Sequence, residues 1–140
     1  MTGVAASIVS VGYQGRSVDE LIEVLRGGGV ELLVDVRLNP ISRKPGLSKK
    51  PLSRTLAAAG IGYRHERALG NQRDNRDPFD RQRYGDYLAE NGSAVLAEIM
   101  ELAKSVRVAL LCYEHQHRDC HRSCILDLVV QQQAVRVLEL

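Results

Sequence analysis

Short apolar runs alternate with amphipathic segments along the chain. The runs are rich in valine, isoleucine and leucine, and they predict five β-strands, over residues 7–11, 31–36, 61–65, 106–111 and 134–138. The second and fourth runs are nearly continuously apolar, which is typical of strands covered on both faces of a sheet. The pattern therefore predicts a sheet that lies inside the domain.

Segments with helical periodicity separate the strands. They predict five helices, over residues 17–26, 49–59, 82–90, 93–104 and 121–132. Ser17 and Glu20 form a capping-box pattern at the start of the first helix, and glycines 27–29 follow its end. Because strands and helices alternate, we expect an α/β fold. It would be a single three-layer domain over residues 1–140, with a mostly parallel five-stranded sheet and helices on both faces.

The composition fits one globular domain with an aliphatic core. The chain has 140 residues, of which 44% are hydrophobic, with no tryptophan and one phenylalanine. No apolar run approaches the roughly 20 residues that span a bilayer, and the N-terminus lacks the basic region of a signal peptide. The three cysteines are odd in number and all lie within residues 112–124, which predicts reduced thiols in a cytoplasmic protein.

The net charge of +2 hides a basic middle segment. Residues 37–83 contain 12 Lys/Arg and 4 Asp/Glu, a balance of +8, and the remainder contains 7 and 13, a balance of −6. This asymmetry indicates an anionic partner, either a phosphate-containing small molecule or nucleic acid. The alternative is a solvated, arginine-rich surface with no ligand. No feature points to a membrane, and the sequence makes no prediction of the oligomeric state.

Candidate binding residues follow the predicted strands, at the carboxyl edge where open parallel sheets bind ligands. Arg37 could bind a phosphate or carboxylate, with Asp35 as its orienting partner or as a base; alternatively the two form a structural ion pair. Tyr13, beside Arg16 after the first strand, either stacks on a ring or packs at the edge of the core. Arg43 lies in a Pro/Gly loop that is either a flap over an anion or a plain turn.

Reactive side chains are densest in residues 112–124, CYEHQHRDCHRSC. Cys120 falls where the last helix should begin, and the helix dipole together with His121 and Arg122 would favour its thiolate as a nucleophile or redox thiol. Glu114 could then act as an acid, a base or an orienting partner. The same helix start could instead bind phosphate with no covalent step. Alternatively, Cys112 is a small, inert core residue and Cys120 is an ordinary residue at the start of the helix.

A zinc site is a second interpretation of this segment. Six side chains are candidate ligands: Cys112, His115, His117, Cys120, His121 and Cys124. The segment lacks the paired C-x2-C spacing of a zinc knuckle, so zinc is possible but not favoured. A third interpretation is an exposed loop, which we favour for His115, His117, Arg118 and Asp119.

Four motifs, taken together, are similar to those of a known family. They are GYQGRS at 12–17, LLVDVRLNPISRKPGL at 32–47, ALGN at 68–71, and LLCYE with CHR between 110 and 122. In this order and spacing the chain resembles the domain of unknown function 488 family. The resemblance implies a small prokaryotic α/β domain and supplies no reaction. It maps the family pattern onto Gly12, Tyr13, Gly15, Arg16, Asp35, Arg37, Pro40, Ser42, Arg43, Pro45, Cys112, Glu114, Cys120, His121 and Arg122. His115, His117 and Cys124 lie outside the pattern, which weakens the zinc interpretation.

These observations favour a small cytoplasmic enzyme of unassigned activity, with a cysteine/arginine anion-binding site at the carboxyl edge of the sheet. Its substrate would be a phosphorylated metabolite, a nucleotide or a nucleic acid. The predicted catalytic residues are Cys120, Glu114, Asp35 and His121, and the predicted anion-binding residues are Tyr13, Arg16, Arg37, Arg43 and Arg122. One alternative is a non-enzymatic nucleic-acid-binding module that uses residues 37–83, and another is a structural zinc domain. The sequence has no G-x-S-x-G, Walker or dinucleotide-binding motif, which argues against those classes of enzyme.

Overall fold

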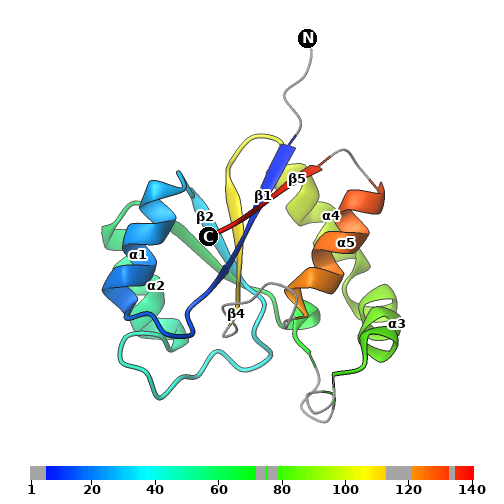
Figure 1. The fold of residues 1–140 in the computed structure, drawn as a ribbon, viewed down its shortest axis with the longest axis horizontal. Coiled ribbons are helices and arrows are strands. Elements are labelled where there is room, and N and C mark those ends of the chain that lie inside the picture. Colours follow the sequence, from blue (N-terminus) through cyan, green and yellow to red (C-terminus); the bar gives the residue numbers. More distant parts are fainter. Residues whose placement is uncertain (1–5, 72–74, 76–78, 113–120, 133–134) are drawn as a thin grey trace.

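Strands and helices alternate along the chain in the computed structural model, which describes residues 6–71, 75, 79–112, 121–132 and 135–140 (Figure 1). The elements are β1 (Ala6–Gly12), α1 (Val18–Gly27), β2 (Leu32–Asp35), α2 (Lys49–Ala58), β3 (Gly62–His65), the short 3-10 helix η1 (Arg67–Leu69), α3 (Arg81–Asn91), α4 (Ser93–Leu102), β4 (Val108–Cys112), α5 (Arg122–Gln132) and β5 (Val135–Glu139). Every predicted strand and α-helix is present, with ends shifted by no more than two residues. The helix η1 was not predicted.

The five strands form one sheet in the order β3-β2-β4-β1-β5, and every neighbouring pair is parallel. The predicted α/β fold is therefore confirmed. β4 occupies the centre of the sheet, and all five of its residues are buried, as its continuously apolar sequence predicts.

Helices cover both faces of the sheet and make two separate cores. Figure 1 shows α1 and α2 on one side and α3, α4 and α5 on the other. Alternate residues of β4 point to opposite faces, as the period of a strand requires. Val108, Leu110 and Cys112 belong to the core beneath α3–α5, and Ala109 and Leu111 belong to the core beneath α1 and α2.

The connections leave the carboxyl edge of the sheet in two directions. The chain passes from β1 and β2 into α1 and α2 on one face, whereas it passes from β4 to α5 on the other face. β4 lies between β1 and β2, so the chain diverges on both sides of its carboxyl end. Such a divergence is where ligands bind in doubly wound sheets.

The start of α1 confirms the predicted capping box at this edge. The backbone N–H of Ser17 donates to Oε1 of Glu20 at 2.8 Å, and the backbone N–H of Glu20 donates to Oγ of Ser17 at 3.1 Å. The pair fixes where the turn after β1 enters the helix. In the described part of the chain, no helix is long and apolar enough to cross a membrane.

Candidate functional site

The buried polar side chains of the described residues gather at the carboxyl edge of the sheet. They are Ser10, Asp35, Arg37, Asn71, Asn75, His121 and Arg122. All except Ser10 lie at the end of a strand or in the segment that follows one. Burial of polar groups is unfavourable unless they are hydrogen-bonded, so this edge has a hydrogen-bonding requirement that the rest of the core lacks.

Asp35 and Arg37 form a buried, bidentate ion pair at the end of β2. Arg37 donates from Nε to Oδ1 at 2.8 Å and from Nη2 to Oδ2 at 2.6 Å, and its backbone N–H also donates to Oδ1 at 3.1 Å. The hydroxyl of Tyr63, on β3, donates to Oδ2 at 2.6 Å. The carboxylate thus accepts four hydrogen bonds, which is about its full capacity.

The guanidinium of Arg37 joins three segments of the chain. Its Nη1 donates to the carbonyl of Leu47 at 2.6 Å and to the hydroxyl of Tyr13 at 3.4 Å, and its Cζ lies 5.4 Å from the centroid of the Tyr13 ring. Burial alone would lower the pKa of Arg37, but the hydrogen bonds and charge of Asp35 outweigh it and raise that pKa above its ordinary value. Arg37 therefore stays charged and holds the turn after β1 against the loop after β2.

Tyr63 is the further member of this cluster that the sequence did not indicate. Burial and the hydrogen bond to Asp35 raise the pKa of its hydroxyl above the ordinary value. The register of β2 and β3 explains the contact, since Leu33 pairs with Tyr63 and Asp35 with His65. Side chains two residues apart share a face, so Tyr63 reaches Asp35 diagonally.

Two histidines cap consecutive carbonyls at the end of β2. Nε2 of His121 lies 2.8 Å from the carbonyl oxygen of Val36, and Nε2 of His65 lies 2.7 Å from that of Arg37. A carbonyl only accepts, so Nε2 is the protonated nitrogen in each ring. The His121 ring also packs edge-on against Tyr84, with centroids 5.3 Å apart. His121 thereby joins the start of α5 to the end of β2.

Arg122 is the first residue of α5, and its side chain is 0% exposed. It is the largest fully buried side chain of the described residues. Its Nε and Nη1 make no hydrogen bond, although Arg122 does interact with other groups of the chain. A buried guanidinium at a helix start places fixed positive charge beside the positive end of the helix dipole.

The turn after β1 is tied to the loop after β2 by a lysine. Nζ of Lys44 donates to the carbonyls of Arg16 at 2.8 Å and of Tyr13 at 3.3 Å. Nη1 of Arg16 lies 3.1 Å from the carbonyl of Gly12 and 3.3 Å from that of Leu140, and it donates to both. Tyr13 is buried and its hydroxyl accepts from Arg37 rather than facing water, whereas Arg43 is exposed on the loop.

The ALGN segment at 68–71, which follows β3, packs against the loop after β2 and against α3. Leu69 is buried, and its carbonyl accepts from the hydroxyl of Tyr84 at 2.6 Å. A Cβ on Gly70 would lie 2.6 Å from Cα of Leu38, so only glycine fits there without a backbone shift. The Nδ2 of Asn71 donates to the Asn75 carbonyl at 2.7 Å, and the Nδ2 of Asn75 donates to Oδ1 of Asn71 at 3.2 Å.

The cysteines differ in state, which corrects one prediction. Cys112 is disulfide-bonded, whereas the sequence predicted reduced thiols throughout. An odd number of cysteines does not say which thiols meet in space, and that was the weakness of the prediction. Cys124 is a buried free thiol in the core beneath α3–α5.

Several predicted residues lie outside the described part of the chain. These are Cys120 and Glu114, together with the candidate zinc ligands His115 and His117 and the loop residues Arg118 and Asp119. Within the described residues, no group of three or more His, Cys, Asp or Glu side chains could hold a metal ion. The predicted catalytic roles of Cys120 and Glu114 stay predictions.

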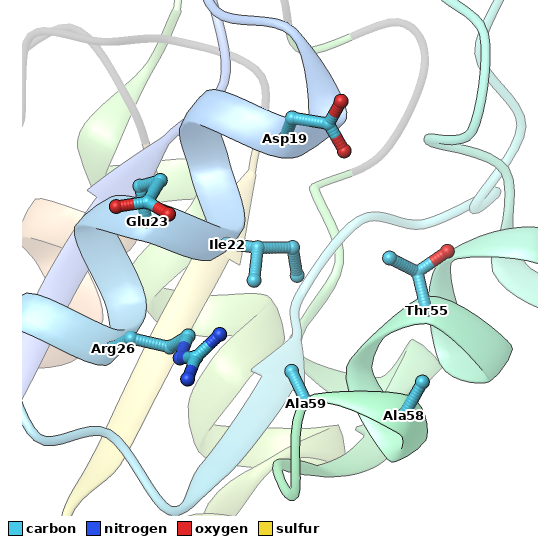
Figure 2. Close-up of a pocket in the computed structure, with 7 residues that line it drawn as sticks. All are labelled: Asp19, Ile22, Glu23, Arg26, Thr55, Ala58 and Ala59. Atoms are coloured by element: carbon cyan, nitrogen blue, oxygen red, sulfur yellow. The ribbon is translucent and has the colours of Figure 1, made fainter.

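A shallow hollow of about 330 Å³ lies between α1 and α2, away from the residues predicted from the sequence (Figure 2). Its lining consists of Asp19, Ile22, Glu23, Arg26, Thr55, Ala58 and Ala59. Ile22 and the two alanines form an apolar floor, and the charged side chains stand on α1. It shares no residue with the buried polar cluster.

The structure brings together the predicted residues of three distant stretches. Tyr13 contacts Arg37, Arg37 pairs with Asp35, and His121 bonds to the carbonyl between them. Sequence reasoning missed Tyr63, His65 and the two buried asparagines, and it placed Lys44 in the Pro/Gly loop without its contacts to the turn after β1. For Tyr63 and His65 the available signal was their place on the strand that pairs with β2.

The fold and this edge define the class of protein: an α/β domain with an all-parallel, doubly covered sheet and a buried, charged cluster where its strands end. The model of the family described as "Domain of unknown function DUF488" matches residues 17–129. The chain therefore belongs to this family. The turn at Tyr13 precedes the matched range. No curated protein and no solved structure matches the chain.

Proposed function

We propose that the protein is a small enzyme that binds a phosphate-bearing substrate at the carboxyl edge of its sheet. The observation that carries the proposal is the gathering of buried polar and charged side chains at that edge. A strand end at a point of chain divergence, a helix start and a buried arginine together favour an oxyanion over a neutral ligand.

Arg122 is the anion-binding residue in this proposal, and His121 holds it in place. His121 fixes the start of α5 against β2 through the Val36 carbonyl, so the first turn of α5 cannot shift without breaking a buried hydrogen bond. The guanidinium is a fork that matches two phosphate oxygens, and because Arg122 is 0% exposed and already interacts with other groups, its present contacts would have to open for a phosphate to reach it.

Arg37 and Asp35 act as positioning residues in this proposal. Asp35 already accepts four hydrogen bonds, so its predicted role as a base would require the ion pair to open. Arg37 holds Tyr13 and Leu47, which border the edge. The predicted nucleophile Cys120 and acid/base Glu114 enter the proposal from the sequence alone, and the thiolate role applies to the reduced protein, since Cys112 is disulfide-bonded in this structure.

Thermal unfolding with inorganic phosphate or ADP tests the binding step. We expect phosphate to raise the Tm of the wild type and of Lys104→Gln, a control at the opposite edge, but not that of Arg122→Gln. Arg122→Lys keeps the charge and loses the fork, so it should retain a smaller shift. Equal shifts in the wild type and in a folded Arg122→Gln would contradict the proposal.

Alkylation of the reduced protein tests the chemical step. With an activated thiolate, iodoacetamide should label Cys120 at neutral pH faster in the folded protein than in urea, with Cys120→Ser as the control. Slower labelling of the folded protein would exclude an activated Cys120.

A further inference from the structure

Unneutralised positive charge covers the loop after β2 and the start of α2. Between Asp35 and Glu66 the sequence holds seven Lys/Arg and no Asp/Glu. Four of these cations are exposed and make no side-chain ion pair or hydrogen bond within the described residues: Arg43, Lys49, Lys50 and Arg54. The exposed positive charge of the basic segment predicted from composition is thus concentrated in one stretch, from Arg43 to Arg54.

Other cations of the basic segment are already paired. Arg37 is buried against Asp35, Arg64 bonds to Glu66 and Glu98, and Arg81 bonds to Asp127. These arginines have carboxylate partners within the protein. Among the residues that the structure describes, the four exposed cations of the loop and α2 have no such partner, and they are the ones that an anionic partner would neutralise.

The charge placement on α2 is unfavourable for the isolated protein. Lys49 and Lys50 lie in the first turn, which has no acidic residue, so they oppose the helix dipole. Lys50 and Arg54 are also like charges four residues apart on one helix face. The side chain of the N-cap residue Ser48 does not cap the helix, because its Oγ bonds to the backbone of Ser42. A negatively charged partner at this helix start would offset the unfavourable interaction of the lysines with the helix dipole and would reduce the repulsion between Lys50 and Arg54.

Two hydrogen bonds hold the loop after β2, and the apolar side chain of Ile41 is exposed between them. The carbonyl of Pro40 accepts from the backbone N–H of Lys49 at 2.9 Å, and the N–H of Ser42 donates to Oγ of Ser48 at 2.9 Å. Ile41 lies between these two hydrogen bonds and is 78% exposed. Among the described residues, it is the one large hydrophobic side chain that is exposed. The loop is therefore ordered before any partner binds.

We propose that this basic surface, made of Ile41, Arg43, Lys49, Lys50 and Arg54, binds the sugar-phosphate backbone of nucleic acid. The cations would contact successive phosphates, and Ile41 would contact a sugar or base, as apolar side chains do in the minor groove. Lys50 and Arg54 are about 6 Å apart along the helix axis. The four cations are therefore spread over a surface longer than a single phosphate group, which suits a polymer with several phosphates. A single apolar side chain is too little for insertion into a membrane interface, which needs an apolar face.

This surface stands independently of the carboxyl-edge site, although the same loop borders both. Fluorescence anisotropy with a short labelled single strand and its duplex, titrated over rising NaCl, tests it. For the duplex we expect Lys49→Gln/Lys50→Gln to weaken binding about tenfold or more and to make the log–log salt slope shallower by about 1.8. Ile41→Ser should weaken binding several-fold and leave the slope unchanged.

The matched control is Arg26→Gln/Lys104→Gln, which removes the same charge from exposed side chains that precede β2 and β4, at the opposite edge. It should bind like the wild type. Equal weakening in both double variants, no binding at low salt, or binding to phosphatidylserine vesicles but not to nucleic acid would overturn the proposal. The phosphate-dependent Tm shift of Lys49→Gln/Lys50→Gln reports the carboxyl-edge site separately, so the two proposals fail independently.

Discussion

The guanidinium of Arg37 is bound by the carboxylate of Asp35, two residues earlier, through two parallel hydrogen bonds of 2.8 and 2.6 Å. Both side chains are buried, and the pair sits where β2 leaves the sheet. The loop after β2 begins at this ion pair. Arg37 donates to Tyr13 and to the carbonyl of Leu47, and Asp35 accepts from Tyr63. The ion pair therefore holds three segments of the chain together at the carboxyl edge of the sheet.

Arg37→Gln should lower the free energy of unfolding by about 3–5 kcal/mol, because it leaves the Asp35 carboxylate buried without its counter-ion. Urea denaturation measures the loss. Arg64→Gln is the control, since Arg64 is 30% exposed and its ion pairs should contribute about 1 kcal/mol or less. Similar losses in the two variants would show that the buried pair is not a structural centre.

Tyr63→Phe should lower the free energy of unfolding by about 1.5–3 kcal/mol, because it removes a 2.6 Å hydrogen bond to a charged acceptor. Tyr87→Phe is the control for losing a tyrosine hydroxyl, since Tyr87 is also only partly buried, against the core on the other face of the sheet. An unchanged stability of Tyr63→Phe would mean that Asp35 does not need this donor.

Stability should fall above about pH 10, where free tyrosine ionises. Burial raises the pKa of Tyr84 above its ordinary value, and its hydroxyl donates to the Leu69 carbonyl at 2.6 Å. The unfolded chain therefore loses the proton at a lower pH than the folded one, so rising pH favours unfolding. Urea denaturation at pH 9 and 11 should show a smaller pH-dependent loss for Tyr84→Phe than for the wild type. An equal loss would place the titration elsewhere.

Gly70→Ala and Gly85→Ala should change stability in opposite directions. A Cβ on Gly70 would lie 2.6 Å from backbone Cα of Leu38, so the alanine must displace the loop after β2 and destabilise the fold. A Cβ on Gly85, inside α3, would meet nothing within 4 Å, so the alanine should stabilise by about 0.5–1 kcal/mol. Thermal unfolding compares the two, and a neutral Gly70→Ala would contradict the close approach.

The secondary structure could be predicted because local signals agree at each boundary. The capping box at Ser17 and Glu20 and the glycines after α1 define that helix without tertiary information. The nearly continuously apolar run at 106–111, interrupted by Arg107, became the central strand β4, and such a run is typical of a strand covered on both faces.

The site could be predicted only in part, because its contacts depend on strand order and register. Alternation put Asp35 and Arg37 on one side of β2 and left ion pair and ligand-binding role as open alternatives. That Tyr63 donates to Asp35 follows from β3 pairing with β2, and no spacing in the sequence encodes this. The disulfide of Cys112 was also missed, because an odd number of closely spaced cysteines does not say which of them are bonded.

The most direct measurement of the central claim is a crystal structure of the protein soaked with inorganic phosphate. We expect a phosphate ion at the carboxyl edge, within hydrogen-bond distance of the Arg122 guanidinium and the first turn of α5. A phosphate bound only elsewhere, with the first turn of α5 ordered and vacant, would contradict the claim.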